Sequence, residues 1–374
     1  MDHARRRVLH VSQSTETGVP YVVDDYVRRQ LEAGWEVAVA CPGGTLAALM
    51  RGLGVEVLDW PAAREPDPRL LPREVAGLRR VVRSWGPDLV HLHSAKAGLA
   101  GRLALRGRLP TVYTPHAWSW LAAQGRTRRA AQAWERLGSR WSVTCCVSES
   151  ERAEGRAVGI TGDLRLIPND VEVGALRAGA PVDRAQARKL LEVDDDVQLV
   201  VCCARLAHQK GQDVLLRAWP AVVAAEPQAR LVLVGGGPDE EALRRQARGV
   251  EHVRFLGDAP RETSVAWMVA SDVVTCPSRY EGMSLVPIEA GALGRVVVAS
   301  DVEGVREGGW GPARVVVPVE DADALAGALH QVLADPAARA EAEAVAWACG
   351  DDLAQQPRAA DRVLELYAEL LGRA

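Results

Sequence analysis

Short apolar runs alternate with helix-like stretches along the whole chain, and this alternation limits the folds open to it. Strands that are apolar throughout and separated by helices are typical of parallel sheets covered by helices on both faces. Because 374 residues are too many for one ordinary core, we expect an α/β fold with two Rossmann-like domains. The predicted strands are 8–11, 37–40, 89–91, 111–114 and 143–147 in the first half, and 199–203, 231–234, 253–255, 273–276, 296–299 and 314–317 in the second.

Two cations follow the apolar run at 199–204. Arg205 comes directly after it and Lys210 shortly after that, and Lys210 is one of only three lysines in a chain rich in arginine. Arginine offers a planar fork for two phosphate oxygens, and lysine offers a compact charge. Since open α/β sheets bind ligands at the carboxyl ends of their strands, both residues are candidate phosphate ligands.

Two carboxylates follow another predicted strand, in the segment SRYEGMSLVPIEAGALGRVVVAS. Glu281 lies in a predicted loop and Glu289 in a predicted helix over 285–293, so both can accept hydrogen bonds from hydroxyl groups in one pocket. Backbone N–H groups at the start of that helix favour an anion. The amides concerned are those of Gly282, Met283, Ser284 and Leu285. Each charged pair alone also fits a solvated surface; together, in this order, they indicate a sugar-nucleotide site.

Further segments resemble a known family. They are ARLAHQKG, LVLVGGGPDEEALR, VRFLGD, CVSESER, LIPNDVEV, VLHVSQSTETGVP, HLHSAKAGLAGRLALRG and YTPHAWSW. With the E-x7-E spacing, they are similar to the bacterial retaining glycosyltransferases of family 4, which have the GT-B fold, with two Rossmann-like domains facing across a cleft. The resemblance implies an acceptor-binding domain at 1–173 plus 356–374 and a nucleotide-sugar-binding domain at 174–355. It would fold a C-terminal helix at 361–371 back onto the first domain.

The resemblance also implies roles for the second-half residues. Arg205 and Lys210 would bind the donor diphosphate and stabilise the leaving nucleotide as negative charge grows on it. Glu281 would hold hydroxyls of the donor sugar, with the amides of 282–285 nearby, and Glu289 would hold the ribose. The nucleotide base is expected beside the backbone at 256–259.

In the first half, the resemblance points to His116 and Gly18. His116, in YTPHAWSW, would place its ring near the reacting carbon; the alternative is a histidine that closes a turn after Pro115. Gly18 would let the backbone approach the diphosphate, although Thr17 stands where the family often has a second glycine. Two further departures are Asp170 in place of glycine, which affects a turn, and Arg295 in place of proline, which puts a charge near the donor cleft or on the surface.

The implied activity is that of a hexosyltransferase. It moves a sugar with retention from a nucleoside-diphosphate sugar, with UDP favoured, to an alcohol such as a polysaccharide precursor, a glycolipid or a secondary metabolite. The donor is a co-substrate, and no cofactor is expected. Two alternatives stay open. A nucleotide-sugar epimerase of the same fold would need no acceptor, and a non-catalytic partner subunit would bind the nucleotide sugar without transfer.

We expect no metal site. His91 and His93 lie two apart on a predicted strand, but the sequence shows no third or fourth ligand at suitable spacing. The seven cysteines lie in apolar runs without a CxxC motif and are expected to be free thiols. The glycine run at 235–237 lacks the GxGxxG pattern and is predicted to form a tight turn before a helix.

Charge is unevenly divided between the halves. Residues 1–172 carry a balance of +5 and the remainder −9, and a predicted helix at 127–141 has arginines on one face and Ala130, Trp134, Leu137 and Trp141 on another. This helix is either simply solvated or, with Trp118 and Trp120 nearby, in contact with anionic lipid or with the pyrophosphate of an acceptor. Nucleic-acid binding is not indicated. Since neither a signal peptide nor a membrane span is recognisable, we expect a cytoplasmic protein, at most peripheral at the inner face of the membrane.

Overall fold

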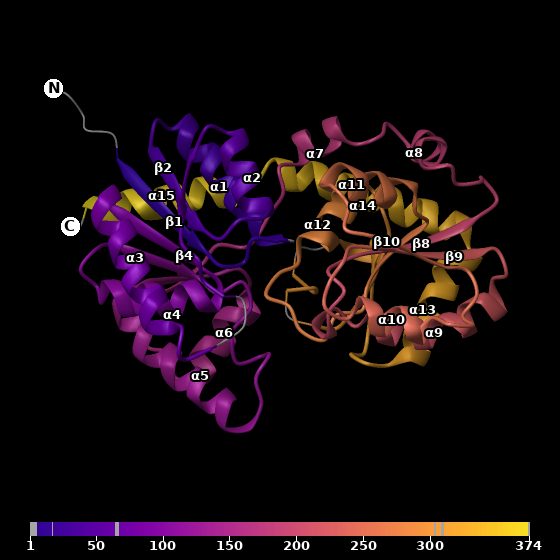
Figure 1. The fold of residues 1–374 in the computed structure, drawn as a ribbon. Coiled ribbons are helices and arrows are strands. Elements are labelled where there is room, and N and C mark those ends of the chain that lie inside the picture. Colours follow the sequence, from indigo (N-terminus) through magenta and orange to yellow (C-terminus); the bar gives the residue numbers. More distant parts are fainter. Residues whose placement is uncertain (1–5, 17, 64–66, 303, 308–309, 373–374) are drawn as a thin grey trace. The chain divides into compact units, whose positions relative to one another are not determined.

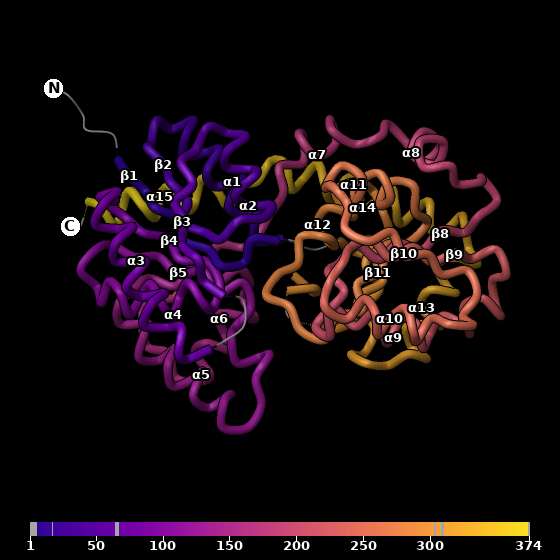
Figure 2. Tube along the Cα trace, viewed as in Figure 1, coloured from indigo at the N-terminus to yellow at the C-terminus, as the bar shows by residue number. Residues whose placement is uncertain are grey.

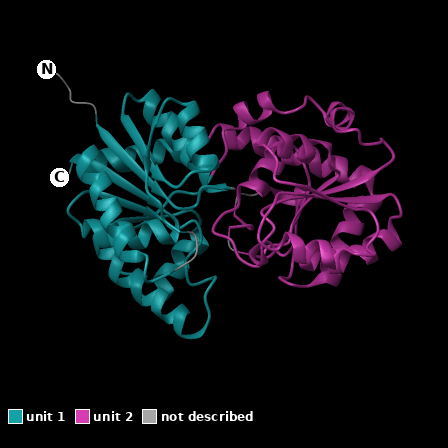
Figure 3. Cartoon of the chain, in the orientation of Figure 1, with its two compact units in different colours: residues 1–169, 357–374 teal, residues 170–356 magenta. Residues whose placement is uncertain are grey.

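The computed structural model describes residues 6–16, 18–63, 67–302, 304–307 and 310–372. It divides into two compact units (Figure 3): unit 1 comprises residues 1–169 and 357–374, and unit 2 comprises residues 170–356. In the ribbon and tube views the helices of each unit lie against the faces of a central sheet (Figures 1 and 2). The divisions fall after residues 169 and 356, close to the predicted boundaries at 173 and 355.

Unit 1 contains a seven-stranded parallel sheet with the order β3-β2-β1-β4-β5-β6-β7. Its strands are β1 (Arg7–Ser12), β2 (Glu36–Cys41), β3 (Glu56–Asp59), β4 (Leu89–His93), β5 (Thr111–Thr114), β6 (Val143–Cys146) and β7 (Leu164–Leu166). Its helices are α1 (Gly18–Glu32), α2 (Thr45–Gly52), α3 (Leu71–Trp85), α4 (Ser94–Leu105), α5 (Gly125–Gly138), α6 (Glu149–Ala157) and α15 (Ala359–Gly372), with a 3-10 turn at Ser139–Trp141. Helix α15 packs against α1, and Arg29 bonds Asp361 at 2.5 Å.

Unit 2 contains a six-stranded parallel sheet with the order β10-β9-β8-β11-β12-β13. Its strands are β8 (Gln198–Cys203), β9 (Ala229–Val234), β10 (Val253–Gly257), β11 (Val273–Cys276), β12 (Val297–Ser300) and β13 (Arg314–Val317). Its helices are α7 (Val173–Gly179), α8 (Arg184–Leu191), α9 (Gln212–Ala225), α10 (Glu240–Gln246), α11 (Arg261–Ala270), α12 (Leu285–Ala292), α13 (Ala322–Ala334) and α14 (Pro336–Ala354), with 3-10 turns at His208–Lys210 and Gly311–Ala313.

The two Rossmann-like sheets confirm the predicted fold class, and every predicted strand is present. The sequence missed β3 and β7, which are the two edge strands of the first sheet. Their residues, EVLD and LRL, are mostly half-buried or exposed, because an edge strand has a neighbour on one side only. They therefore lack the continuous apolar run that marks a central strand.

The strand order reverses once in each sheet, and these two points matter most for function. In unit 1 the chain runs outward from β1 to β3 and then resumes at β4 on the other side of β1; in unit 2 the corresponding pair is β8 and β11. Loops that leave the carboxyl ends of such a pair diverge to opposite sides and leave a crevice for a ligand. Ligand-binding residues are therefore expected in the loops after these four strands.

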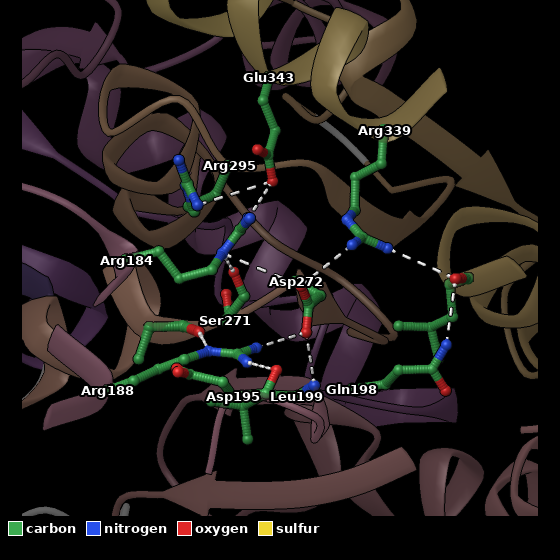
Figure 4. Close-up of polar contacts among 12 residues, drawn as sticks. Arg184, Arg188, Asp195, Gln198, Leu199, Ser271, Asp272, Arg295, Arg339 and Glu343 are labelled. Atoms are coloured by element: carbon green, nitrogen blue, oxygen red, sulfur yellow. Dashed lines mark hydrogen bonds and ion pairs between the residues drawn. The ribbon is translucent and has the colours of Figure 1, made fainter. Parts of the chain in front are cut away.

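Buried ion pairs hold helices against the sheet of unit 2 at the amino end of β11, opposite the carboxyl ends where a ligand is expected (Figure 4). Asp272, directly before β11, accepts the Leu199 N–H of β8 at 2.7 Å and pairs with Arg188 of α8 at 2.7 Å and Arg339 of α14 at 3.3 Å. Arg295 faces Glu343 in the same cluster at 3.6 Å. Burial lowers the pKa of Arg295 to about 10. The expectation that this arginine lies near the donor cleft or on the surface was therefore wrong, because its charge serves the packing of α14.

Helix α5 differs from its predicted packing. Ala130 and Leu137, expected on the core side, are exposed, with Leu137 at 43%. The buried residues of α5 are Gly138 and Glu135, and the Glu135 carboxylate pairs with the equally buried Arg102 of α4 at 2.7 Å. A charged partner on α4 thus sets the inward face of the helix, which hydrophobic periodicity does not reveal.

Trp118 and Trp120 also differ from expectation. Both are almost fully buried, at 2% and 1% exposure, and their rings stack 4.5 Å apart. They belong to the core of unit 1 and offer no surface to a membrane. Among the residues described, no helix combines the length and the apolarity needed to cross a bilayer. All seven cysteines are free, as predicted.

Candidate functional site

The loop after β8 carries the first two candidate residues. Arg205 is half-buried where the strand ends, and Lys210 closes a 3-10 turn before α9. Gly211 follows with a φ of 67°, and a Cβ at that position would lie 1.9 Å from the carbonyl oxygen of Pro277. Only glycine permits this contact. It brings the loop after β8 directly against the loop after β11.

That contact joins Lys210 to Glu281. The ammonium Nζ lies 2.5 Å from Glu281 Oε1, and Ser278 Oγ donates to the same oxygen at 2.7 Å. The two side chains are 20% and 8% exposed, so the pair is partly shielded from water. Gln209 Nε2 donates to the carbonyl of Tyr280 at 3.1 Å and holds the same loop. A cation suited to phosphate and a carboxylate suited to hydroxyls therefore meet at the point where the strand order of unit 2 reverses.

The start of α12 lies beside this pair. The helix begins at Leu285 with Ser284 as its N-cap residue, and the Ser284 side chain makes no capping hydrogen bond. A small cavity is lined by Lys210, Ser278 and Ser284, together with residues of β8 and β11. Gly282 and Met283 lie in the loop just before, and Gly304 packs so close that a Cβ there would lie 2.7 Å from the Gly282 carbonyl oxygen. The helix start thus borders the same cavity as the cation.

Glu289 lies inside α12, with 6% of its surface exposed. It is paired with Arg261, the first residue of α11, through Nη2 at 2.5 Å and Nε at 3.1 Å. Arg261 was not predicted as a site residue, because nothing in its spacing from Glu289 along the sequence indicates a contact. The nucleotide base was expected beside the backbone at 256–259, which comprises the end of β10 and the start of the loop that leads into this arginine.

The glycine run after β9 supports the loop that carries Arg205. A Cβ at Gly235 would lie 2.2 Å from the Ala204 carbonyl oxygen, and one at Gly237 would lie 2.3 Å from that of Leu206. Leu206 N–H donates to the Gly236 carbonyl at 2.8 Å. The run does precede α10, as predicted, but it also forms a close backbone contact that only glycine allows.

In unit 1, His116 lies in the loop after β5. Its φ is 55°, and that of the next residue, Ala117, is 105°, so two consecutive residues other than glycine adopt a conformation that costs free energy. Buried Glu151 holds the loop by accepting the N–H groups of Ala117 at 2.9 Å and Val147 at 2.7 Å. Burial raises the pKa of Glu151 to about 7. Backbone strain held by a buried carboxyl is typical of a functional position.

Gly18 is the first residue of α1, which follows β1 at the reversal point of unit 1. A Cβ there would meet nothing within 4 Å, so the glycine leaves open space rather than relieving a clash. Thr17, which stands in place of a second glycine, lies outside the described residues. Space at a helix start beside a strand end is compatible with an anionic ligand.

Comparisons with known proteins show the family of the chain. Residues 17–174 match the family described as Glycosyltransferase Family 4, and residues 197–335 match Glycosyl transferases group 1. A GDP-mannose-dependent monoacylated alpha-(1-6)-phosphatidylinositol monomannoside mannosyltransferase of Corynebacterium glutamicum is 30% identical over 76% of this chain and 78% of its own length. The chain belongs to glycosyltransferase family 4.

A second relative extends the family match, and a solved structure shows the fold. The D-inositol 3-phosphate glycosyltransferase of Rhodococcus jostii is 31% identical over 92% of this chain and 80% of its own length. The structure of a sucrose-phosphate synthase from Thermosynechococcus elongatus superposes with a TM-score of 0.83 at 24% identity, over 99% of this glycosyltransferase and all of the other chain. The fold is therefore GT-B.

His10 of the glycosyltransferase was also not predicted from the sequence. It lies on β1 opposite His91 of β4, and ligand atoms of His10, His91 and His93 all lie within 4.8 Å of one another. Because the third histidine comes from a neighbouring strand, only the register between β1 and β4 brings it into the group. Spacing along one segment gives no signal for such a partner.

Proposed function

We propose that this glycosyltransferase moves a hexosyl group from a nucleoside-diphosphate sugar to an alcohol, with retention at the anomeric carbon and without a metal ion. The Lys210–Glu281 pair carries the proposal, because it holds a phosphate-binding cation beside a hydroxyl-binding carboxylate. In this proposal, Arg205 and Lys210 bind the diphosphate, Glu281 the sugar and Glu289 the ribose. The amides of 282–285 and the space at Gly18 also serve the donor.

The step exchanges one bond for another at the anomeric carbon. The bond from this carbon to the diphosphate oxygen breaks, its electron pair stays on the leaving nucleotide, and the acceptor oxygen bonds to the same face. The acceptor proton passes to the departing phosphate oxygen. Lys210 and Arg205 lower the barrier because negative charge grows on that phosphate. His116 contributes a hydrogen-bonding group to the donor sugar.

The environment of the carboxylates supports this mechanism. A double displacement of the glycoside-hydrolase kind needs a carboxylate nucleophile and a second carboxyl group close by. In this chain Glu281 is paired with Lys210 and Ser278, and Glu289 with Arg261. Carboxylates held in this way are suited to accept hydroxyl hydrogen bonds, and they are weak nucleophiles because an oxygen of each is already engaged by a cation.

For the donor and acceptor, the comparisons offer particular candidates. The C. glutamicum relative is named for GDP-mannose and for a phosphatidylinositol monomannoside, and the R. jostii relative for D-inositol 3-phosphate. An Anabaena HepE structure, similar in fold at a TM-score of 0.79 and 21% identity, contains UDP and glucose. UDP was favoured by sequence, so both UDP and GDP belong in the first experiment. Inositol-containing alcohols are the first acceptors to test.

The experiment is a thermal-shift panel of UDP, GDP and ADP, each with and without an attached sugar. A ligand at about 100 times its dissociation constant stabilises the folded state by roughly 2.7 kcal/mol, which is about 5–10 °C for a unit of this size. One nucleotide should give this shift. Lys210→Ala should remove it, whereas Lys189→Ala, at an exposed position of α8, should not. Activity with the identified donor should persist in EDTA, and the product should keep the anomeric configuration.

Other outcomes would count against the proposal. Conversion of the nucleotide sugar without an acceptor would indicate an epimerase, and binding without any product would indicate a partner subunit. Lys210→Ala should lower kcat/KM about 100–1,000-fold, the effect of removing one preorganised group at the developing charge. An unchanged kcat in this variant would exclude the role given to Lys210.

A peripheral membrane contact is proposed from the exposed surface of α5. Arg126, Arg128, Arg129 and Arg136 of α5 are exposed, and Leu137 is exposed beside them. A basic helix with an apolar side chain suits an anionic lipid surface. Sedimentation with phosphatidylglycerol vesicles, but not with phosphatidylcholine vesicles, would support the contact. Equal recovery with both would refute it.

A further inference from the structure

A row of buried side chains runs from α1 to His116 in unit 1. Gln30 Oε1 lies 2.9 Å from His10 Nε2, His10 Nδ1 lies 2.9 Å from His93 Nε2, and His93 Nδ1 lies 3.1 Å from His116 Nε2. Gln30, His10 and His93 are at most 1% exposed. The row therefore links an amide on α1 to the candidate residue after β5, through rings on β1 and β4.

Burial keeps the rings of His10 and His93 neutral, and the half-buried ring of His116 is also desolvated. Desolvation lowers the pKa of His10 to about 4 and that of His116 to about 3, and it holds the pKa of His93 well below its ordinary value. A neutral imidazole has one N–H donor and one acceptor nitrogen. Each hydrogen bond between two rings uses one proton, which is carried by one of the two nitrogens. The nitrogen that is protonated on the first ring therefore determines which nitrogen is protonated on each following ring.

We propose that Gln30, His10 and His93 are positioning residues that fix the tautomer of His116, leaving its Nδ1 as an acceptor for a hydroxyl of the donor sugar. The amide oxygen of Gln30 accepts from His10 Nε2–H, so His10 Nδ1 accepts from His93 Nε2–H. By the same step, His93 Nδ1 accepts from His116 Nε2–H. The acceptor role of Nδ1 toward sugar rests on the proposed function; the fixed tautomer does not.

A metal ion explains the cluster less well. Two imidazole nitrogens on one tetrahedral zinc ion would be about 3.3 Å apart, given zinc–nitrogen distances near 2.0–2.1 Å. His10 and His93 approach to 2.9 Å, a hydrogen-bond distance. His91 is already bonded through Nδ1 to Tyr367 OH at 2.5 Å and through Nε2 to Thr114 Oγ1 at 2.7 Å. Its nitrogens thus have partners outside the row.

His91 provides a matched control. It is as buried as His93 and lies two residues away on β4, with the ring centroids 4.0 Å apart and the ring planes tilted by 31°. It takes part in none of the three hydrogen bonds that form the row. A variant of His91 disturbs the same core without interrupting the row.

The test is a long-range proton–nitrogen NMR spectrum of the histidine side chains, recorded on the whole chain without a donor. In the unmodified protein His116 should show one tautomer, with the proton on Nε2. Gln30→Met and His93→Asn should give both tautomers, whereas His91→Asn should leave the single tautomer. A proton on Nδ1 in the unmodified protein, or an unchanged His116 in both row variants, would overturn the proposal.

Kinetics supply the second measurement. Gln30→Met and His93→Asn should lower kcat about tenfold, as expected for one weakened hydrogen bond in the transition state. The dissociation constant of the sugar-free nucleotide should stay unchanged, and His91→Asn should keep the original kcat. Equal losses of kcat in all three variants would show a merely structural role. One equivalent of zinc retained in the purified protein would also overturn the proposal, in favour of a metal site.

Failure of the proposed function gives a different result. If no nucleotide sugar shifts the His116 resonances or the melting temperature, the function is wrong, while the tautomer measurements still decide whether the row sets the state of His116. A single tautomer that is lost in both row variants would support the row even in that case.

Discussion

Replacing Glu281 by glutamine should tighten the binding of a sugar-free nucleotide while impairing sugar transfer. In the structure, Lys210 is paired with Glu281 at 2.5 Å and is therefore not fully available to a diphosphate. Glutamine keeps an oxygen that can accept from Ser278, but it carries no charge. The lysine then loses its competing partner, and the diphosphate no longer approaches a nearby carboxylate.

The size of the gain follows from the shielding of the pair. Fully exposed ion pairs contribute about 0.2–1 kcal/mol, whereas breaking fully buried ones costs about 3–5 kcal/mol. With Lys210 at 20% and Glu281 at 8% exposure, this pair lies between the two limits. Releasing the lysine should favour diphosphate binding by about 1–2 kcal/mol, which is a roughly 5- to 30-fold lower dissociation constant.

Isothermal titration calorimetry with UDP and GDP measures this change directly. The same variant should lose at least about tenfold in kcat/KM for sugar transfer, because the carboxylate no longer accepts from the sugar hydroxyls. Glu289→Gln is the control, since its carboxylate is paired with Arg261 and not with Lys210. It should not tighten nucleotide binding.

Weaker nucleotide binding in Glu281→Gln would refute this reasoning. It would mean that the carboxylate orders Lys210 for the diphosphate rather than competing with it. Equal gains in both variants would show a general effect of negative charge at the site, without a specific role for the pair.

Three further predictions concern stability. Arg102→Met should destabilise the chain by about 3–5 kcal/mol in calorimetry, because it leaves Glu135 charged and buried. The double variant Arg102→Met with Glu135→Leu should recover most of this loss, and additive losses would contradict the prediction. Because folding raises the pKa of Glu151 from 4.5 to about 7, the folded state binds its proton more tightly, so the free energy of unfolding should fall by roughly 3 kcal/mol as pH rises from about 4.5 to 7. Urea unfolding should show this contribution missing in Glu151→Gln, and parallel pH curves for the two proteins would refute it. Gly237→Ala should lower the melting temperature and weaken nucleotide binding, since its Cβ would strike the Leu206 carbonyl oxygen; Gly179→Ala, in open space, should do neither, and equal shifts would refute the contact.

The sequence predicted the features that depend on the order of residues along one segment. Central strands such as β8 and β11 are continuous apolar runs, and the charged residues that follow them come to the same sheet edge because parallel strands all end there. Lys210 and Glu281 could therefore be expected together. Their direct pairing could not, since it depends on the contact of Gly211 with Pro277.

Features that depend on contacts between distant segments escaped prediction. Arg261 of α11 pairs with Glu289 of α12, and His10 is brought to His91 and His93 by the register between β1 and β4. Trp118 was misplaced for a related reason: an aromatic residue in a loop has no periodicity that distinguishes a surface from a core. Its indole N–H donates to the Glu151 carbonyl at 2.7 Å, a partner that only the folded chain provides.

Because α15 belongs to unit 1, unit 2 interrupts unit 1 in the order of synthesis. Residues 170–356 emerge from the ribosome as one continuous stretch, whereas unit 1 is complete only once α15 has been made with Tyr367, whose hydroxyl reaches His91. Domains generally fold as units during synthesis, starting from the N-terminal end. Unit 1 is begun first and completed last. All of unit 2, which carries Lys210, is therefore made before unit 1, which carries His116, is complete.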